Sequence, residues 1–381
     1  MQIKNARVLF KNTIVEKDVL IDNGLICKIA HVEAVEEEQQ SEAIDAKGLL
    51  LLPGLVDAHV HFREPGEIYK EDFTTGSRAA IAGGVTTAMD MPNNKLPTIT
   101  AARLKEKQML AAKKALCDVF FHFGATEDNF DEVNKAKPNS LKIYLSETTG
   151  NYIVGIAAAK KHFGNFKGKI VVHAEGEKLV EKAASIADSK MHLAHATSEK
   201  EVEIAKSIGA TVEAAPHHLL LSKKEIEKLG KLAPVKPPLR DESDRKRLWS
   251  SLHKVDCIAA DHAPHTIEDK ESGAYGYPGL ETSLALMLDA YNKKLITINA
   301  IAEKMASNPA RIFGLSDRGE IAEGKKADLI LVDTRKEWTV KGEELETKCK
   351  WSPFEGWKLK GKVMKTIRNG ELVYDEGEVF D

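Results

Sequence analysis

Eight short apolar segments, each followed by a stretch that can form a helix, run through the middle of the chain. They are LVDAHVHF, GVTTAMDM, CDVFFHFGAT, SLKIYLS, KIVVHAE, KMHLAHATS, TVEAAPHHLL and VDCIAADHAPH. The clearest helix is expected from about 199 to 208, with Ser198 and Glu201 as a capping box and Gly209 as the stop. Eight alternating strand and helix units predict an α/β fold of the (β/α)8 TIM barrel type.

The two ends of the chain show a different pattern. Residues 3 to about 50 alternate apolar and polar positions around Asn23-Gly24, and residues 325–377 do the same around Asn369-Gly370. An Asn-Gly pair between two alternating runs is typical of a β-hairpin. We therefore expect a small, composite β-sandwich-like domain built from residues 1–52 and 315–381, and a barrel built from residues 53–314.

Charge and segment lengths exclude several classes of function. The chain has 381 residues, with Lys+Arg 55 against Asp+Glu 58, so it lacks the basic excess that nucleic-acid binding requires. Its apolar runs are shorter than the roughly 20 residues of a membrane span. The N-terminus has no apolar run followed by a cleavage site, which predicts a cytoplasmic location. The four scattered cysteines form no C-x-x-C pair, so we expect buried or inert thiols.

Histidines and one aspartate lie at the ends of the predicted strands. His59 and His61 close the first segment and, at the period of two of a strand, project on the same side. His173, His195 and Asp261 close later segments. His-x-His alone fits a metal site and a pair of satisfied polar side chains about equally well. Because the carboxyl ends of barrel strands converge on one mouth, all five positions together favour a metal site.

Lys142 stands inside the apolar segment LKIYLS, where a charged amine is costly. One interpretation is an outward-facing lysine that reaches solvent. The other is a carbamate, formed from the neutral amine and CO₂, whose anionic oxygens bridge two divalent ions. Two Zn²⁺ bring four positive charges, of which Asp261, a carbamate and a bridging hydroxide would remove three.

Seven motifs, in order along the chain, resemble those of one enzyme family. They are GLVDAHVHFREPG at 54–66, MPNN at 91–94, LKIYLSET at 141–148, HAE at 173–175, APHH at 215–218, DHAPHT at 261–266 and PGLET at 278–282. The chain resembles the dihydroorotases of the amidohydrolase superfamily, and most closely the branch that includes the dihydroorotase domain of the animal multifunctional pyrimidine enzyme. The resemblance implies reversible, zinc-dependent cyclisation of N-carbamoyl-L-aspartate to L-dihydroorotate in pyrimidine biosynthesis.

The resemblance also implies roles for individual residues. The first of two Zn²⁺ ions would be held by His59, His61 and Asp261, and the second by His173 and His195. Carboxylated Lys142 and a hydroxide would bridge the ions, and Asp261 would act as general base and then as general acid. The implied substrate contacts are Arg63, Asn93 and His265 for the carboxylate, and the backbone around Pro278 and Gly279 for the ring.

Two alternative functions remain open at this stage. Allantoinases and dihydropyrimidinases are similar around His-x-His but typically lack an arginine at the position of Arg63, so Arg63 favours dihydroorotase over allantoin, hydantoin or dihydrouracil as substrate. A salt bridge with Glu64 or Glu67 is the structural alternative for Arg63. A catalytically silent scaffold for aspartate transcarbamoylase is disfavoured because all the expected metal ligands are present, although association with that enzyme is compatible with activity. Symmetry base rates favour a homodimer.

The other histidines receive weaker expectations. His122 is predicted to be a satisfied core histidine, while His31, His162 and His253 are predicted to lie at the surface. His217 and His218 match the APHH motif but fit structural roles as well. Residues 267–277, which follow DHAPHT, are expected to form either a lid or an ordinary surface loop.

Overall fold

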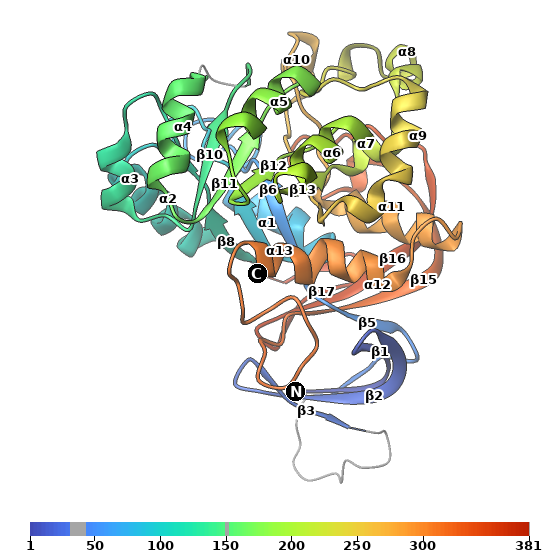
Figure 1. Cartoon of the computed structure of the whole chain (residues 1–381). Coiled ribbons are helices and arrows are strands. Elements are labelled where there is room, and N and C mark those ends of the chain that lie inside the picture. Colours follow the sequence, from blue (N-terminus) through green and yellow to red (C-terminus); the bar gives the residue numbers. More distant parts are fainter. Residues whose placement is uncertain (31–42, 149–151, 381) are drawn as a thin grey trace.

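The computed structural model describes residues 1–30, 43–148 and 152–380, and its centre is a closed ring of parallel strands (Figure 1). The strands are β6 (Leu55–Val60), β7 (Val85–Asp90), β8 (Asp118–Phe121), β9 (Phe123–Gly124), β10 (Ser140–Tyr144), β11 (Lys169–His173), β12 (Met191–Leu193), β13 (Thr211–Ala214) and β14 (Cys257–Ile258). β6 to β8 and β9 to β14 each pair in chain order, and only His122 separates β8 from β9. A bridge between Val60 and His262 closes the ring, which confirms the predicted barrel.

Helices surround this ring. The longer ones are α1 (Phe73–Ala82), α2 (Ala101–Lys114), α3 (Phe130–Ala136), α4 (Ile156–Asn165), α5 (Glu177–Ile186), α6 (Glu199–Ser207), α9 (Glu242–Ser250) and α11 (Leu280–Asn292). The shorter ones are α7 (Pro216–Leu220), α8 (Ile226–Leu229), α10 (Ile267–Glu271), α12 (Ile298–Ala302) and α13 (Asn308–Ile312), with a π-helical turn at Glu303–Ser307 and 3-10 turns at Lys223–Glu225, Gly230–Leu232, Leu252–Lys254 and Gly342–Glu344. The capping box predicted for α6 is present, and the helix ends at Ser207, two residues before the predicted stop Gly209, whose φ of 72° is left-handed.

Strands from both ends of the chain share one nine-stranded sheet. They are β1 (Gln2–Phe10), β2 (Thr13–Asp22), β3 (Leu25–Ala30), β4 (Ala43–Asp45), β5 (Leu50–Pro53), β15 (Leu329–Thr339), β16 (Lys358–Arg368), β17 (Glu371–Asp375) and β18 (Glu378–Val379). Antiparallel pairing of β5 with β15 joins the two ends, and both Asn-Gly pairs connect antiparallel strands as predicted. The domain boundaries at residues 52 and 315 remain a prediction.

Apolar side chains fill one end of the barrel interior. Val56, Met89, Val171 and Cys257 belong to one buried cluster with Phe313, which follows α13. Because this end is closed by apolar packing, the polar side chains of the strands gather toward the opposite, carboxyl end.

One surface prediction is wrong. His162 is buried, its ring stacks on Phe130 at a centroid distance of 4.3 Å, and its Nε2 lies 2.8 Å from the Thr126 carbonyl oxygen. It lies on the face of α4 that packs inward, which a single histidine does not reveal in the sequence. His253 is exposed as predicted, and His31 lies outside the described residues.

The four cysteines are free thiols, three of them buried and Cys27 exposed. Burial raises the pKa of Cys117 to about 12 and that of Cys349 to about 11, which makes both thiols poorly reactive, as expected. Within the described residues, no helix combines the length and the apolar character needed to cross a membrane.

Candidate active site

Two histidines and one aspartate meet at the carboxyl end of β6. The Nε2 atoms of His59 and His61 lie 3.3 and 3.4 Å from the same oxygen, Oδ1 of Asp261. All three side chains are largely buried. Burial lowers the pKa of His59 to about 4, so its imidazole is neutral at pH 7 and keeps a lone pair for a ligand. The strand period alone does not produce this arrangement, because a register shift interrupts the β6–β7 pairing between Asp57 and Val60.

A second histidine pair lies beside the first. His173 ends β11, and its Nδ1 lies 2.8 Å from Nε2 of His195, which follows β12. The rings of His59 and His195 are 5.2 Å apart, so the two pairs form one cluster. Burial lowers the pKa of both His173 and His195, which leaves both rings neutral at pH 7.

Lys142 lies fully buried in β10, and its Nζ has no hydrogen-bond partner among the described residues. Burial lowers its pKa to about 8, against the opposing charges of Glu213 and Asp261. About one tenth of the amine is therefore neutral at pH 7, far more than for an exposed lysine, and only the neutral amine reacts with CO₂. The outward-facing interpretation of Lys142 is wrong, because this side chain does not reach solvent.

These residues fit a site for divalent cations. His59, His195 and Asp261 offer ligand atoms that all lie within 4.8 Å of one another. Nδ1 of His195 is buried with no hydrogen-bond partner in the part of the chain that the structure describes. Neutral imidazoles with a carboxylate form a donor set that suits zinc and other first-row divalent metals.

Glu213 on β13 supports the cluster and was missed by the sequence reasoning. Its carboxylate makes a very short hydrogen bond with Nδ1 of His59, lies 3.1 Å from Nε2 of His192 and accepts the backbone N–H of His195 at 3.2 Å. Although burial opposes it, the contact with His59 holds the pKa of Glu213 well below its usual range. The carboxylate therefore fixes the His59 tautomer with Nδ1–H toward Glu213 and the Nε2 lone pair toward Asp261.

Asp57 links the first and last strands of the barrel and was also assigned no role from the sequence. Its two oxygens accept the backbone N–H groups of His59 at 3.0 Å and Ala260 at 2.9 Å. Burial raises its pKa to about 7. Asp57 thus holds the backbone that carries His59 against the backbone that leads to Asp261.

The predicted carboxylate-binding residues lie at the same mouth. Arg63 is 2 % exposed, donates from Nε to the Pro264 carbonyl at 3.1 Å and places Nη2 2.9 Å from Nε2 of His265. No carboxylate lies within ion-pair distance of Arg63 among the described residues, so the structural alternative with Glu64 or Glu67 is not observed. Nε2 of His265 also lies 2.9 Å from the Tyr275 carbonyl oxygen, and its Nδ1 is buried with no hydrogen-bond partner in the described part of the chain.

Asn93 follows β7 and lies near His61. Its Nδ2 also lies 3.4 Å from Oγ1 of Thr148. Pro278 is buried, and the next residue, Gly279, passes so close to the carbonyl of Ala260 that a Cβ would lie 2.9 Å from that oxygen. Only glycine allows this close approach of the two loops.

Three of the predicted site residues have left-handed backbones. The φ angles are 62° at Arg63, 34° at His195 and 45° at Asp261. Such conformations cost on the order of 1 kcal/mol for a residue with a Cβ. They persist where the surrounding structure holds the side chain in one place, and they mark these residues independently of the sequence motifs.

The remaining histidines of the barrel are mostly structural. His122 is satisfied as predicted, with Nδ1 2.7 Å from Oγ of Ser140 and Nε2 3.0 Å from the Ala58 carbonyl. His217 and His218 are buried beside each other, and Nε2 of His218 lies 3.0 Å from the Pro237 carbonyl. The segment 267–277 begins with α10, and its Lys270 is buried, with Nζ donating to the carbonyls of Ala274 and Gly276.

Comparison with known proteins connects this geometry to a family. The model of the amidohydrolase family matches residues 50–373. The chain is 41% identical to the dihydroorotase of Pyrococcus horikoshii, over 98% of this chain and 92% of that protein. It is 36% identical to the multifunctional protein CAD of Squalus acanthias, over 89% of this chain and 16% of that much longer protein.

Solved structures show the same architecture. The L-hydantoinase (dihydropyrimidinase) of Arthrobacter aurescens superposes with a TM-score of 0.95 and 26% identity, over 100% of this chain and 97% of that one. The dihydropyrimidinase of Brevibacillus agri superposes with a TM-score of 0.90 at 21% identity, over 99% of this chain and 95% of that one, which supports the fold alone.

Proposed function

Because the chain belongs to the amidohydrolase family, we propose that it is a dihydroorotase, which closes N-carbamoyl-L-aspartate to L-dihydroorotate and hydrolyses the ring in reverse. This assignment rests on the dihydroorotases that are similar over nearly the whole chain and on a mouth that joins a cation site to a buried arginine. The single observation that supports dihydroorotate as the substrate is that Arg63 is buried and has no carboxylate partner among the described residues.

We propose that the cluster holds two Zn²⁺ ions. His59, His61 and Asp261 would hold one, His173 and His195 the other, and carboxylated Lys142 would lie between them. Bound divalent ions would polarise the amide carbonyl and lower the pKa of the attacking water. The buried amine of Lys142, with a pKa near 8, supports the carboxylation, since it is partly neutral at neutral pH.

The proton transfers are assigned to Asp261. In hydrolysis its carboxylate takes a proton from the attacking water as oxygen bonds to the ring carbonyl, and gives that proton to the ring nitrogen as the C–N bond breaks. Burial, together with the nearby Glu213 carboxylate, raises the pKa of Asp261 and makes it a stronger base than an exposed aspartate. In ring closure the same steps run in reverse.

The substrate carboxylate is assigned to Arg63, Asn93 and His265. A guanidinium binds a carboxylate through two parallel hydrogen bonds. Nε2 of His265 lies 2.9 Å from both the Arg63 guanidinium and the Tyr275 carbonyl oxygen, which would place this ring beside the bound carboxylate. The backbone at Pro278 and Gly279 would contact the ring. Allantoin, hydantoin and dihydrouracil carry no carboxylate at this position, so they would leave the Arg63 charge buried and unpaired.

The test of this assignment is Arg63→Ala. We expect kcat/KM for L-dihydroorotate to fall by about 100-fold or more, because a buried charge-assisted pair contributes several kcal/mol. Zinc content should be unchanged. Arg103, which is 40% exposed and pairs with Glu106 on α2, provides the control Arg103→Ala, which should behave as wild type. Full activity of Arg63→Ala would contradict the carboxylate role and favour a sister substrate.

The wider setting of the reaction is proposed from the same resemblance. The reaction belongs to pyrimidine biosynthesis, and a cytoplasmic location, a homodimer and association with aspartate transcarbamoylase stay predictions. The last is supported by the relatives in which a matching segment is part of a multifunctional protein.

A further inference from the structure

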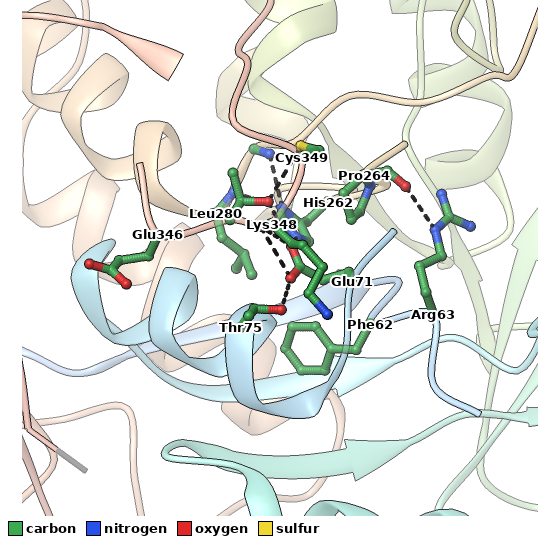
Figure 2. Close-up of polar contacts among 12 residues, drawn as sticks. Phe62, Arg63, Glu71, Thr75, His262, Pro264, Leu280, Glu346, Lys348 and Cys349 are labelled. Carbon is green, nitrogen blue, oxygen red and sulfur yellow. Dashed lines mark hydrogen bonds and ion pairs between the residues drawn. The ribbon is translucent and has the colours of Figure 1, made fainter. Parts of the chain in front are cut away.

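Residues 345–351, here called the strap, belong to the connection between β15 and β16 of the nine-stranded sheet. The strap leaves that sheet and lies against the barrel mouth, where Figure 2 shows Lys348 and Cys349 beside Glu71 and His262. It therefore joins the sheet built from the chain ends to the loops that follow the barrel strands.

Two buried or half-buried carboxylates of the barrel fasten the strap. Glu281 on α11 accepts the backbone N–H groups of Glu346 at 2.8 Å and Thr347 at 3.0 Å. Glu71, which precedes α1 and is fully buried, accepts the Thr347 hydroxyl at 2.6 Å and the Lys348 backbone N–H at 3.3 Å. These contacts fix the strap in one place rather than leaving it as a loose connection.

The attachment at Glu71 connects the strap to the loop that holds Pro278 and Gly279. Oε2 of Glu71 lies 3.5 Å from Nε2 of His262, and both side chains are buried (Figure 2). Nδ1 of His262 in turn accepts the backbone N–H groups of Gly279 at 3.1 Å and Leu280 at 3.4 Å. Because Nδ1 accepts, the ring proton lies on Nε2 and faces Glu71.

A further contact, made by Trp351, connects the strap to His265. Nε1 of Trp351 donates to the His265 carbonyl at 2.8 Å, and the Trp351 ring packs edge-on against Tyr277 at 6.1 Å. Lys270, pinned by loop carbonyls, lies over the Trp351 ring at 5.7 Å. Trp351 thus holds the backbone of the histidine that contacts Arg63.

We propose that the strap is a positioning element for the substrate site, and that Trp351 is its main positioning residue. The contact that Trp351 makes with His265 is with its backbone carbonyl. Trp351 acts through His265, whose imidazole it holds beside the Arg63 guanidinium where the substrate carboxylate binds. This inference rests on the proposed function, and it gives the sheet built from the chain ends a role in substrate recognition.

The test compares Trp351→Phe with a matched control. The control is Trp338→Phe, because Nε1 of Trp338 donates to a carbonyl in the same sheet, that of Gly361 at 3.0 Å. Each variant keeps an aromatic ring and loses one indole hydrogen bond. Steady-state kinetics with L-dihydroorotate, inhibition by orotate, zinc content and melting temperature are measured for both variants and for wild type.

We expect Trp351→Phe to raise both KM for L-dihydroorotate and the inhibition constant of orotate by about tenfold. Its kcat should stay within about twofold of wild type, because a contact that is equally strong in the ground state and the transition state affects binding alone. Trp351→Phe and Trp338→Phe should have the same zinc content and the same decrease in melting temperature. The KM of Trp338→Phe should equal that of wild type. A second variant, Thr347→Val, removes the hydroxyl bond to Glu71 without changing side-chain volume much, and should raise KM in the same direction.

Identical KM values in Trp351→Phe and Trp338→Phe would overturn the positioning role while leaving the proposed function intact. A loss of zinc or of kcat in Trp351→Phe would also overturn it, because the effect would then be general damage to the site. Wild-type protein that is inactive on L-dihydroorotate would contradict the proposed function itself, and with it the substrate that the strap is said to position.

Discussion

At the scale of single residues, charged side chains within apolar strands mark the chemistry. Lys142 was found from the sequence because a lysine is out of place in LKIYLS. Glu213 is equally out of place in the strand TVEA, and that signal could have identified it. It was missed because a motif assigns ligands and not the residues that orient them, and only the fold shows that Glu213 faces His59.

The orienting role of Glu213 predicts a specific effect on metal binding. Glu213→Gln replaces the acceptor for the Nδ1–H of His59 with a neutral amide, and the affinity for zinc should fall about 10- to 100-fold, as is usual when such a partner is lost. Zinc retained during dialysis against graded chelator concentrations measures the change. Glu199→Gln, at the first position of α6, is the control and should retain zinc as wild type does. Equal retention by both variants would contradict the role given to Glu213.

At the scale of elements, the start of a helix can be predicted from the sequence where a side chain caps the backbone. The α6 helix begins where Ser198 and Glu201 predicted it, because the Ser198 hydroxyl accepts the Glu201 N–H at 3.2 Å and the Glu201 carboxylate accepts the Ser198 N–H at 3.2 Å. The strap was not predicted, since its contacts with the barrel join residues 65 or more positions apart and no local pattern encodes them. The left-handed backbone conformations at Arg63, His195 and Asp261 could not be predicted from the sequence either, because the packing of the whole barrel stabilises them.

The capping box gives a prediction for the stability of this element. Ser198→Ala should lower the free energy of unfolding by about 1 kcal/mol, the usual cost of losing an N-cap. Urea denaturation followed by circular dichroism measures the change. Ser185→Ala is the matched control, because the exposed Ser185 hydroxyl in α5 only donates to the Lys182 carbonyl, and its effect should be smaller. A Ser198→Ala variant as stable as wild type would show that the cap contributes nothing.

At the scale of the whole molecule, one carboxylate ties the barrel to the sheet built from the chain ends. Asp118 on β8 accepts from Arg318 at 2.8 Å, from Lys326 at 2.8 Å and from Nη2 of Arg368, on β16, at 2.5 Å. Although burial opposes it, the hydrogen bonds from these cations hold the pKa of Asp118 below its usual range. The sequence predicted the barrel and the pairing of the two chain ends, but not this connection, which joins residues 200 or more positions apart.

The lowered pKa predicts how stability depends on pH. A carboxyl with a depressed pKa in the folded state stabilises the protein above its unfolded pKa of 3.8, and this contribution is lost as the pH falls through the folded pKa. Asp118→Asn should therefore cost about 2 kcal/mol at pH 7, and the gap between variant and wild type should narrow below about pH 4. Melting temperatures from pH 7 to pH 2.5 measure this gap. A difference in melting temperature between Asp118→Asn and wild type that stays constant as the pH falls would contradict the ion-pair account. The same difference in the control Asp128→Asn, at an exposed site, would also contradict it.

The most direct test of the whole account is the rate at which zinc-loaded wild-type protein opens the ring of L-dihydroorotate, followed by ultraviolet absorbance. The account predicts turnover on the order of 1 per second or more, with much lower rates for allantoin, hydantoin and dihydrouracil, which lack the carboxylate that Arg63 binds. No turnover of L-dihydroorotate by fully metallated protein, or faster turnover of one of the other three rings, would contradict it.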